Sequence, residues 1–355
     1  MPINISITDP PYSAAIDDTT DDSAAWQRAF DDLGANGGGR LLFNKPGTSR
    51  VLKTVTIPRV DNITFEGLGR NVCVINGVGF PGAPVFEWDN TSNQHVEYCL
   101  WQNMTIRHTQ SGRVIRHQNA DANVQRFKDC VFRNLGLVQG SNGTEVTLDV
   151  EGILHSRFED IHLIGGNNGG TGFRVRGSHV FLENIYAPTK SSAPSMFLDF
   201  QSSNSRIAHV RTEGGNSSIA DYWIHDCVTV DIQDLHSEGV TSPSIVRIEN
   251  CNGVLLASVG IAIQDECVME PVGIRFINSK YCIMIGGHVG ARQGSDGYAI
   301  LFDENSNHNT LSAVRIIRTD SQGQPNQILD QGVGNRWSIV EKSGLGTGTS
   351  FIMPY

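Results

Sequence analysis

The hexapeptide FEDIHL, at residues 158–163, belongs to a set of segments with one shared pattern, and this pattern decides the fold. Each copy has an apolar residue, any residue, a small polar anchor, and then apolar–any–apolar. The copies are FRNLGL (132–137), FEDIHL (158–163), LENIYA (182–187), IAHVRT (207–212), IQDLHS (232–237) and LASVGI (256–261). With three weaker copies included, the anchors are Asn103, Asn134, Asp160, Asn184, His209, Asp234, Ser258, Gly286 and Ala313. Successive anchors lie 24 to 31 residues apart, which indicates an internal repeat.

The apolar positions change parity at every anchor. They lie two residues before it and one and three residues after it, as Phe158, Ile161 and Leu163 illustrate. Because side chains alternate with period two along a strand, this change predicts a bend in the backbone at the anchor. A second apolar strand follows in each repeat. Such a coil buries its apolar face only when it stacks on its neighbours, at ~4.8 Å, so the sequence predicts an all-β parallel solenoid of about nine to eleven coils.

The open end of a solenoid needs a cap. Residues 21–33, DDSAAWQRAFDDL, predict an α-helix with an apolar stripe, and Asp21 or Asp22 is placed to cap its first turn. We therefore expect an N-terminal strand and capping helix over residues 1–40, a parallel β-helix over 41–340 and a C-terminal tail over 341–355.

Composition and charge exclude several classes of function. The net charge is −10 and Lys and Arg are scattered, so no nucleic-acid partner is expected. The longest apolar-leaning stretch, Gly253 to Ile263, is much shorter than the roughly 20 residues of a membrane helix, so no membrane partner is expected either. There is no CxxC, HxH or HExxH pattern, and we predict neither a cofactor nor a metal. The first residues, MPINISITDPPY, lack the features of a cleavable signal peptide.

The cysteines fall at matching positions of neighbouring repeats. Cys99 and Cys130 lie four residues before an anchor, and Cys227 and Cys251 lie seven before one. Stacking brings each pair within the range of a disulfide. The favoured interpretation is a ladder of buried thiols in the core, with disulfides as the alternative.

The N-terminal segment resembles a known family. DDTTDDSAAWQRAF (17–30), GGGRLLFNKPGTSRVLKTVTIP (37–58) and the turn EGLGRN (66–71) together are similar to the opening of the pectate-lyase-like superfamily, although Asp18 replaces a glycine of its motif. The resemblance implies a single-stranded right-handed parallel β-helix. Its members include polysaccharide lyases, glycoside hydrolases, epimerases, fructan-cleaving transferases and phage tailspikes, which implies a polysaccharide partner. It also implies a homotrimer as a candidate assembly, and an extracellular or virion-associated location. The motif itself is structural, so the chemistry must be sought elsewhere.

The outward positions of the first strand lie two and four residues after each anchor. Along the repeats, the position two after the anchor carries Thr105, Gly136, His162, Tyr186, Arg211, His236, Gly260, His288 and Arg315. Only the coils anchored at His209 and Asp234 carry titratable side chains at both positions, in the near-copies RTEGG (211–215) and HSEGV (236–240). These two coils are the candidate site.

In this alignment Glu213 lies directly beside Glu238, with backbones ~4.8 Å apart. Two carboxylates that close repel, so one pKa should rise while the other stays low. A protonated and an ionised carboxyl are the pair that glycoside hydrolysis requires. We therefore predict catalytic roles for Glu213 and Glu238. The predicted substrate-binding residues of the same strip are His162, Tyr186, Arg211 and His236.

Three other interpretations stay open. In a polysaccharide lyase, His236, Tyr186 or His162 would remove the C5 proton of a uronate while Arg211 neutralises its carboxylate. In a non-catalytic spike or adhesin, the strip would bind a glycan without cutting it. In a purely structural interpretation, the glutamates form a solvated ladder offset by Arg211 or His236.

Overall fold

The computed structural model describes residues 3–89, 95–110, 112–118, 127–140, 145–164, 171–187, 196–215, 217–240, 242–263, 272–291, 298–318, 328–342 and 350–352. The chain divides into two compact units, Met1–Ser191 and Ser192–Tyr355, and each is described by itself.

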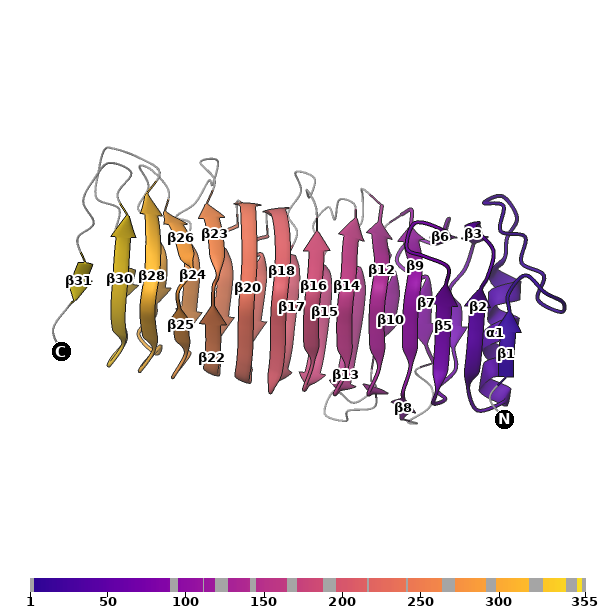
Figure 1. Ribbon diagram of the computed structural model, residues 1–355, viewed down its shortest axis with the longest axis horizontal. Coiled ribbons are helices and arrows are strands. Elements are labelled where there is room, and N and C mark those ends of the chain that lie inside the picture. The colour runs from indigo at the N-terminus through magenta and orange to yellow at the C-terminus, as the bar shows by residue number, and fades with distance from the viewer. Residues whose placement is uncertain are drawn as a thin grey trace. The chain divides into compact units, whose positions relative to one another are not determined.

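Unit 1 consists of one helix and short strands (Figure 1). Its elements are β1 (Ile3–Ser6), α1 (Ser23–Ala35), β2 (Gly39–Phe43), β3 (Gly47–Val51), β4 (Val55–Ile57), β5 (Ile63–Gly67), β6 (Cys73–Gly77), β7 (Phe86–Trp88), β8 (Val96–Glu97), β9 (Leu100–His108), β10 (Ile115–His117), β11 (Phe127–Lys128), β12 (Val131–Gln139), β13 (Leu148–Leu154), β14 (Arg157–Ile164), β15 (Thr171–Ser178) and β16 (Phe181–Ala187).

All strand pairs in unit 1 that have a described register are parallel. One ladder runs β2–β5–β9–β12–β14–β16, and another runs β4–β7–β10–β13–β15. β9 pairs with β5 through its first half and with β6 through its second half, so the chain changes direction within this strand. Figure 1 shows these strands side by side as stacked arrows. Each coil therefore adds one strand to every face, as the repeat predicts.

The N-terminal cap closes the first coils of unit 1. α1 packs against β2 and β4, and its apolar stripe buries Trp26, Phe30 and Leu33 completely. The Trp26 ring lies 5.3 Å from the ring of Phe65 on β5. The helix begins two residues later than the range read from the sequence, and it seals the end of the core as predicted.

Of the two residues expected to cap this helix, Asp21 binds its first turn and Asp22 does not. Asp22 occupies the N-cap position, yet its carboxylate makes no hydrogen bond to the helix. It accepts hydrogen bonds from the Ala15 and Ile16 amides, at 2.7 and 3.2 Å, and from the Ser49 hydroxyl at 2.7 Å. Asp21 instead accepts a hydrogen bond from the Ser23 amide, at 2.9 Å. The buried Asp22 carboxylate thus joins the helix start to the segment before it and to β3.

Unit 2 consists of strands alone among its described residues. They are β17 (Met196–Ser203), β18 (Ser205–Gly215), β19 (Tyr222–His225), β20 (Val228–Val240), β21 (Ser244–Glu249), β22 (Asn252–Ala257), β23 (Gly260–Ile263), β24 (Val272–Ile277), β25 (Ile283–Ile285), β26 (His288–Ala291), β27 (Tyr298–Phe302), β28 (Thr310–Arg318), β29 (Ile328–Asp330), β30 (Arg336–Lys342) and β31 (Ser350–Ile352). β18 pairs in parallel with β20, and β20 pairs with β22 before its bend and with β23 after it. β19–β21–β24–β27–β29 is the second parallel ladder.

The anchors are the bends of the coils. All nine anchors have a positive φ, from 50° at Asn134 to 65° at Gly286. Asn and Asp tolerate this left-handed conformation better than most residues, which accounts for their frequency here. They also hydrogen-bond between coils: the Asn134 amide donates to Asn103 at 2.8 Å in unit 1, and His209 contacts Asp234 at 2.9 Å in unit 2. The bend that the change in parity predicts is confirmed at every repeat.

The inward column two residues before the anchors forms the core. Trp101, Phe132, Phe158, Leu182, Ile207, Ile232 and Leu256 are all 2% exposed or less. Stacking is direct where rings follow one another, since Phe132 and Phe158 lie 4.9 Å apart and within 6° of parallel. The predicted fold class, an all-β right-handed parallel β-helix with an N-terminal capping helix, is confirmed. No helix within the described ranges is long and apolar enough to cross a membrane.

The aligned cysteines are core thiols. Cys99, Cys130, Cys227 and Cys251 are buried and free, in agreement with the thiol ladder rather than with disulfides. Burial raises the pKa of the Cys130 thiol well above its usual range, which keeps it in the unreactive protonated form. Cys267 lies outside the described residues.

A buried ion pair in unit 2 predicts a pH-dependent stability. His225 contacts Asp199 and Asp226 at 2.8 Å each, and the Asp199 and His225 side chains are 6% and 8% exposed. Burial alone would lower the pKa of His225, but its hydrogen bonds to the two carboxylates raise it above 6.5. The stabilisation is therefore full below pH 6.5 and is lost as pH rises through the folded-state pKa of His225. Its size is about 1.4 kcal/mol for each unit by which the folded-state pKa exceeds the unfolded-state pKa.

This dependence can be measured by urea unfolding between pH 6 and pH 9, monitored by tryptophan fluorescence, to which Trp223, whose ring stacks on His225 at 4.0 Å, contributes. The wild-type free energy of unfolding should fall with pH more steeply than that of a His225→Gln variant. Equal slopes for the two proteins would contradict a charged His225 in the folded state.

Candidate functional site

The site predicted in unit 2 is assembled by two adjacent parallel strands. In the register of β18 with β20, Arg211 lies opposite His236 and Glu213 lies opposite Glu238. Thr212 and Ser237, between them, point inward and are fully buried. Alternation along the strand therefore places the four charged or titratable side chains on the outer face, as the sequence predicts.

The four side chains form one connected cluster. The Arg211 guanidinium is 3.0 Å from a Glu213 carboxylate oxygen and 3.9 Å from a Glu238 oxygen. His236 Nε2 is 2.6 Å from the other Glu238 oxygen. The side chains are partly exposed, from 30% at His236 to 50% at Arg211. We call Arg211, Glu213, His236 and Glu238 the acid cluster.

The surroundings of Glu238 favour its ionised form. The hydrogen bond from His236 lowers the pKa of Glu238, and the charges of His236 and Arg211 act in the same direction. Glu238 is therefore ionised over the whole neutral range. Because Arg211 lies against both carboxylates, it also offsets the repulsion that two stacked glutamates would otherwise have.

The same outward column continues along unit 2. His236 lies opposite Gly260, Gly260 opposite His288, and His288 opposite Arg315. A Cβ at Gly260 would lie 2.9 Å from His236 Nδ1 and 3.1 Å from His288 Cε1, so the two imidazoles lean over this glycine from either side. Burial lowers the pKa of His288, and the nearby His236 and Arg315 lower it further. His288 is therefore neutral at pH 7 and can both donate and accept a hydrogen bond.

His162 and Tyr186, the other predicted binding residues, belong to unit 1. They lie opposite each other on β14 and β16, with their rings 5.5 Å apart at 73°. Burial and the Arg70 guanidinium lower the pKa of His162. Arg70 donates to the Asp160 carbonyl at 3.3 Å, and its backbone carbonyl accepts a hydrogen bond from Thr105.

Three residues of these outward surfaces were not selected from the sequence: Arg70, which lies beside the column of unit 1, and His288 and Arg315, which belong to the column of unit 2. Arg70 comes from the turn EGLGRN, which was assigned only a structural role, and no spacing rule places it beside a residue 90 positions away. His288 and Arg315 follow Gly260 in the aligned column, but their coils have no titratable residue four positions after the anchor. A search for titratable residues two positions after the anchor, without requiring another four positions after it, would have found His288 and Arg315.

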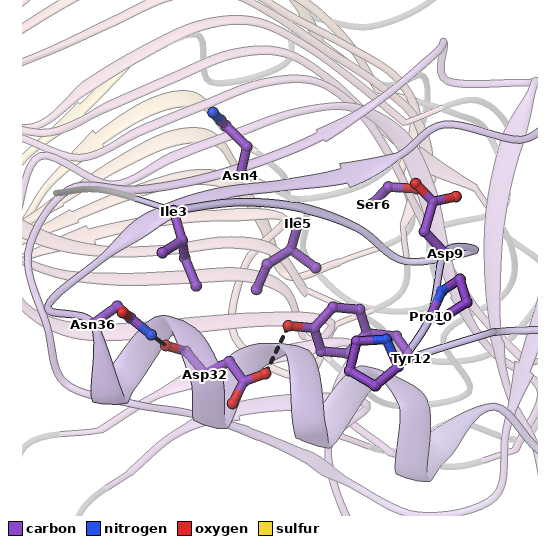
Figure 2. Close-up of a pocket in the computed structure, with 10 residues that line it drawn as sticks. Ile3, Asn4, Ile5, Ser6, Asp9, Pro10, Tyr12, Asp32 and Asn36 are labelled. Carbon is purple, nitrogen blue, oxygen red and sulfur yellow. Dashed lines mark hydrogen bonds between the residues drawn. The ribbon is translucent and has the colours of Figure 1, made fainter.

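A cavity of about 500 Å³ lies at the N-terminal end of unit 1 (Figure 2). It is bordered by β1, the segment 9–12 and α1. The Tyr12 hydroxyl donates to Asp32 at 2.6 Å, and burial together with this bond raises the pKa of Tyr12 to about 12. The Tyr12–Asp32 pair is thus engaged in holding the cap together, so this cavity is not the preferred site.

Within the described ranges, no three His, Cys, Asp or Glu side chains are grouped to hold a metal ion. What the acid cluster offers is an ionised carboxylate, a second carboxylate one coil away, an imidazole oriented by Glu238, and a guanidinium. Such a set can transfer protons and stabilise negative charge on a substrate.

No protein-family model matches the chain, and no curated protein matches it. Several solved structures are similar to this chain in fold. The A-module of the mannuronan C-5 epimerase AlgE6 of Azotobacter vinelandii has a TM-score of 0.57 and 15% identity, over 93% of this chain and 99% of that module. The catalytic unit of the thermostable GH87 α-1,3-glucanase of Streptomyces thermodiastaticus strain HF3-3 has a TM-score of 0.56 and 11% identity, over 94% of this chain and 68% of that one.

The ORF18 protein of Geobacillus virus E2 has a TM-score of 0.55 and 14% identity, and the match covers 96% of this chain but only 61% of that protein. At these identities the likeness concerns the fold. It agrees with the repeat in the sequence and with the parallel ladders of both units. This chain therefore has the parallel β-helix fold that its repeat and its opening motif indicated.

Proposed function

We propose that this protein is an enzyme that acts on a polysaccharide at the acid cluster. The observation that carries the proposal is the connected set of Arg211, Glu213, His236 and Glu238 on one outer face of two neighbouring strands. An open row of polar side chains along stacked strands suits an extended polymer, which can lie across several coils. The named activities of two structural neighbours, a mannuronan epimerase and an α-1,3-glucanase, support this class of substrate.

Glycoside hydrolysis is the reaction proposed first. The lowered pKa of Glu238 makes it the nucleophile or the base that activates water, because both roles require an ionised carboxylate. Glu213 is then the group that protonates the leaving oxygen. Arg211 lies 3.0 Å from Glu213, where its guanidinium can also contact an acidic group of the substrate.

β-Elimination is the second candidate, favoured by the orientation of His236. Glu238 holds Nε2 of this ring, and Nδ1 faces the space above Gly260, beside His288. An imidazole oriented by a carboxylate is a suitable base for the C5 proton of a uronate. Arg211 would then stabilise the negative charge that develops on the uronate carboxyl group.

Product analysis separates these reactions. The wild-type protein is incubated with a panel of capsular and O-antigen polysaccharides, and the products are analysed by mass and ultraviolet absorbance. Hydrolysis adds one water per bond cut and creates a reducing end, whereas elimination creates an absorbing double bond without adding water. A protein that binds a member of the panel but leaves it intact would instead be a non-catalytic adhesin.

The pH dependence of Glu238 gives a second, more local test. Because its pKa is lowered, the ionised form should persist below pH 4.5, and activity should fall only as pH drops through this lowered value. In a His236→Asn variant the main cause of the shift is gone, so the pKa should move up toward 4.5. NMR titration of the Glu238 side-chain carbon measures this directly, whether or not the variant is active. A His288→Asn control, which leaves the Glu238–His236 bond in place, should not shift the titration.

Assembly and location extend the proposal. An extracellular or virion-associated enzyme and a homotrimer are predictions from the family resemblance. Light scattering of the purified full chain tests the trimer.

A further inference from the structure

A second cavity, of about 260 Å³, lies in unit 2 away from the acid cluster. It is lined by Tyr281, His308, Thr310, Gly334 and Arg336. The acid cluster lies after the anchors on β18 and β20, whereas this cavity lies where the chain enters β25, β28 and β30. We call these five residues the corner site.

Two aligned columns build the corner site. Backbone hydrogen bonds from Tyr281 to Asn307 and from His308 to Val333 place Tyr281, His308 and Gly334 at equivalent positions of successive coils. The Tyr281 and His308 rings lie 5.4 Å apart and within 12° of parallel. Two residues further along the chain, Thr310 lies opposite Arg336 in the register of β28 with β30. The cavity therefore has aromatic rings on one side and a hydroxyl and a guanidinium on the other.

The two rings are held in a backbone conformation that their residue types disfavour. Tyr281 has φ 54° and His308 has φ 58°, both in the left-handed region. The neighbouring positions of this column carry Gly253 and Gly334, which adopt such angles without a steric cost. Tyr281 also remains 56% exposed, so little burial of its ring offsets the strain. The angle itself belongs to the bend of the coils, since Thr229 at an equivalent position has φ 56°. What distinguishes Tyr281 and His308 is that exposed, stacked rings stand on this bend beside a cavity.

The backbone under the rings is held in place by buried amides. Asn309, which is 1% exposed, accepts a hydrogen bond from the Cys282 amide at 2.9 Å, and Asn335 accepts one from the Asn309 amide at 2.8 Å. The residues that follow the two rings, Cys282 and Asn309, are thus each tied to the next coil. A site whose supporting residues are already fixed loses little entropy when a ligand binds.

We propose that the corner site binds a pyranose unit of a glycan, apart from the place where the glycan is processed. The apolar face of a sugar ring would lie on the Tyr281–His308 pair, and its hydroxyl or acidic groups would meet Thr310 and Arg336. The ligand class rests on the proposed function, but the site does not depend on catalysis. Its role is to retain the polymer on the protein between successive events at the acid cluster.

Asparagine variants separate binding from structure. Asn suits a positive φ, so Tyr281→Asn and His308→Asn remove a ring without adding backbone strain. Both should weaken the binding of oligosaccharides by about tenfold, equivalent to about 1.4 kcal/mol, and should keep or raise the melting temperature. The matched control is Tyr98→Asn in unit 1, an exposed tyrosine with φ 60° that should not alter affinity.

The probes are partial acid hydrolysates of capsular and O-antigen polysaccharides, so they do not depend on cleavage by the protein. In the full chain, ring signals of His308 in the ¹H–¹³C NMR spectrum should shift on titration, in the wild type and in Glu238→Gln alike, but not in Tyr281→Asn. A fall in melting temperature with unchanged affinity would show the rings to be structural and overturn the inference. So would an absence of His308 shifts with every probe.

The two proposals fail in different ways. Shifts of His308 without any cleavage by the wild type would leave the corner site standing and refute the enzymatic function. Cleavage without His308 shifts would leave the enzymatic function standing and refute the corner site.

Discussion

Replacement of Glu238 by glutamine should lower kcat/KM for polysaccharide cleavage by about 10²–10⁴-fold, with little change in melting temperature. The amide has nearly the shape of the carboxylate but can neither act as a base nor form a covalent intermediate. Stability should change little because the Glu238 side chain is 48% exposed, and ion pairs at such positions contribute little to folding. Activity is measured by reducing-end release or by ultraviolet absorbance, whichever the product analysis establishes.

Two companion variants sharpen this result. Glu213→Gln should be comparably slow if the two acids act as a unit, and the double variant should be little worse than either single one. Glu183→Gln is the matched control, since Glu183 is an exposed outward glutamate on β16 that lies before the anchor. If Glu238→Gln kept wild-type activity, Glu238 would have no catalytic role. If Glu183→Gln were equally slow, the effect would not be specific to the acid cluster.

Replacement of Asp22 by alanine should destabilise the N-terminal cap by about 3–5 kcal/mol. Asp22 is only 3% exposed, and its carboxylate accepts hydrogen bonds from the Ala15 and Ile16 amides and from Ser49. Ser49 in turn accepts a hydrogen bond from the Trp26 indole at 2.8 Å. Alanine would leave three donors without an acceptor, two of them buried and the Ala15 amide partly buried. Each charge-assisted bond is worth about 1.5–3 kcal/mol before losses through relaxation.

Hydrogen exchange of the α1 amides measures this effect locally, since a stacked repeat can open at one end without unfolding throughout. Asp31→Ala is the control, because Asp31 is an exposed residue of the same helix bonded only to the side chain of Gln27 among the contacts described. Protection of α1 should fall sharply in Asp22→Ala and hardly in Asp31→Ala. Equal protection in both variants would mean that the Asp22 carboxylate does not hold the cap.

The register of the coils could be predicted because the information is local and repeated. One change in parity at an anchor is weak evidence, but nine equivalent bends indicate where each strand turns. Parallel stacking then aligns equivalent residues of neighbouring coils, which is why Glu213 and Glu238 are opposite each other as expected. The direction of each side chain followed from the alternation of inward and outward residues along a strand, so the four members of the acid cluster share an outer face.

The connections within the site did not follow from this pattern. Nothing in the spacing of HSEGV shows that His236 turns to Glu238 rather than to solvent, because both rotamers are open to an exposed strand residue. The expected pKa split between the two glutamates stays a prediction, and the spacing gave no sign that the hydrogen bond from His236 lowers the pKa of Glu238. Arg70 reaches the outward column of unit 1 from a turn whose motif marks only structure.

At the start of α1, too, the sequence predicts the element but not the partners of its acidic residues. DDSAAWQRAF correctly predicts an amphipathic helix, since local spacing and propensity suffice for that. Which backbone amides the Asp22 carboxylate binds depends on where β3 and the preceding segment pack against the helix start. Periodicity therefore specifies the coils, their stacking and the face each residue occupies, because these repeat along the chain. The partner of each polar side chain depends on contacts between segments distant in sequence, and only folding brings those segments together.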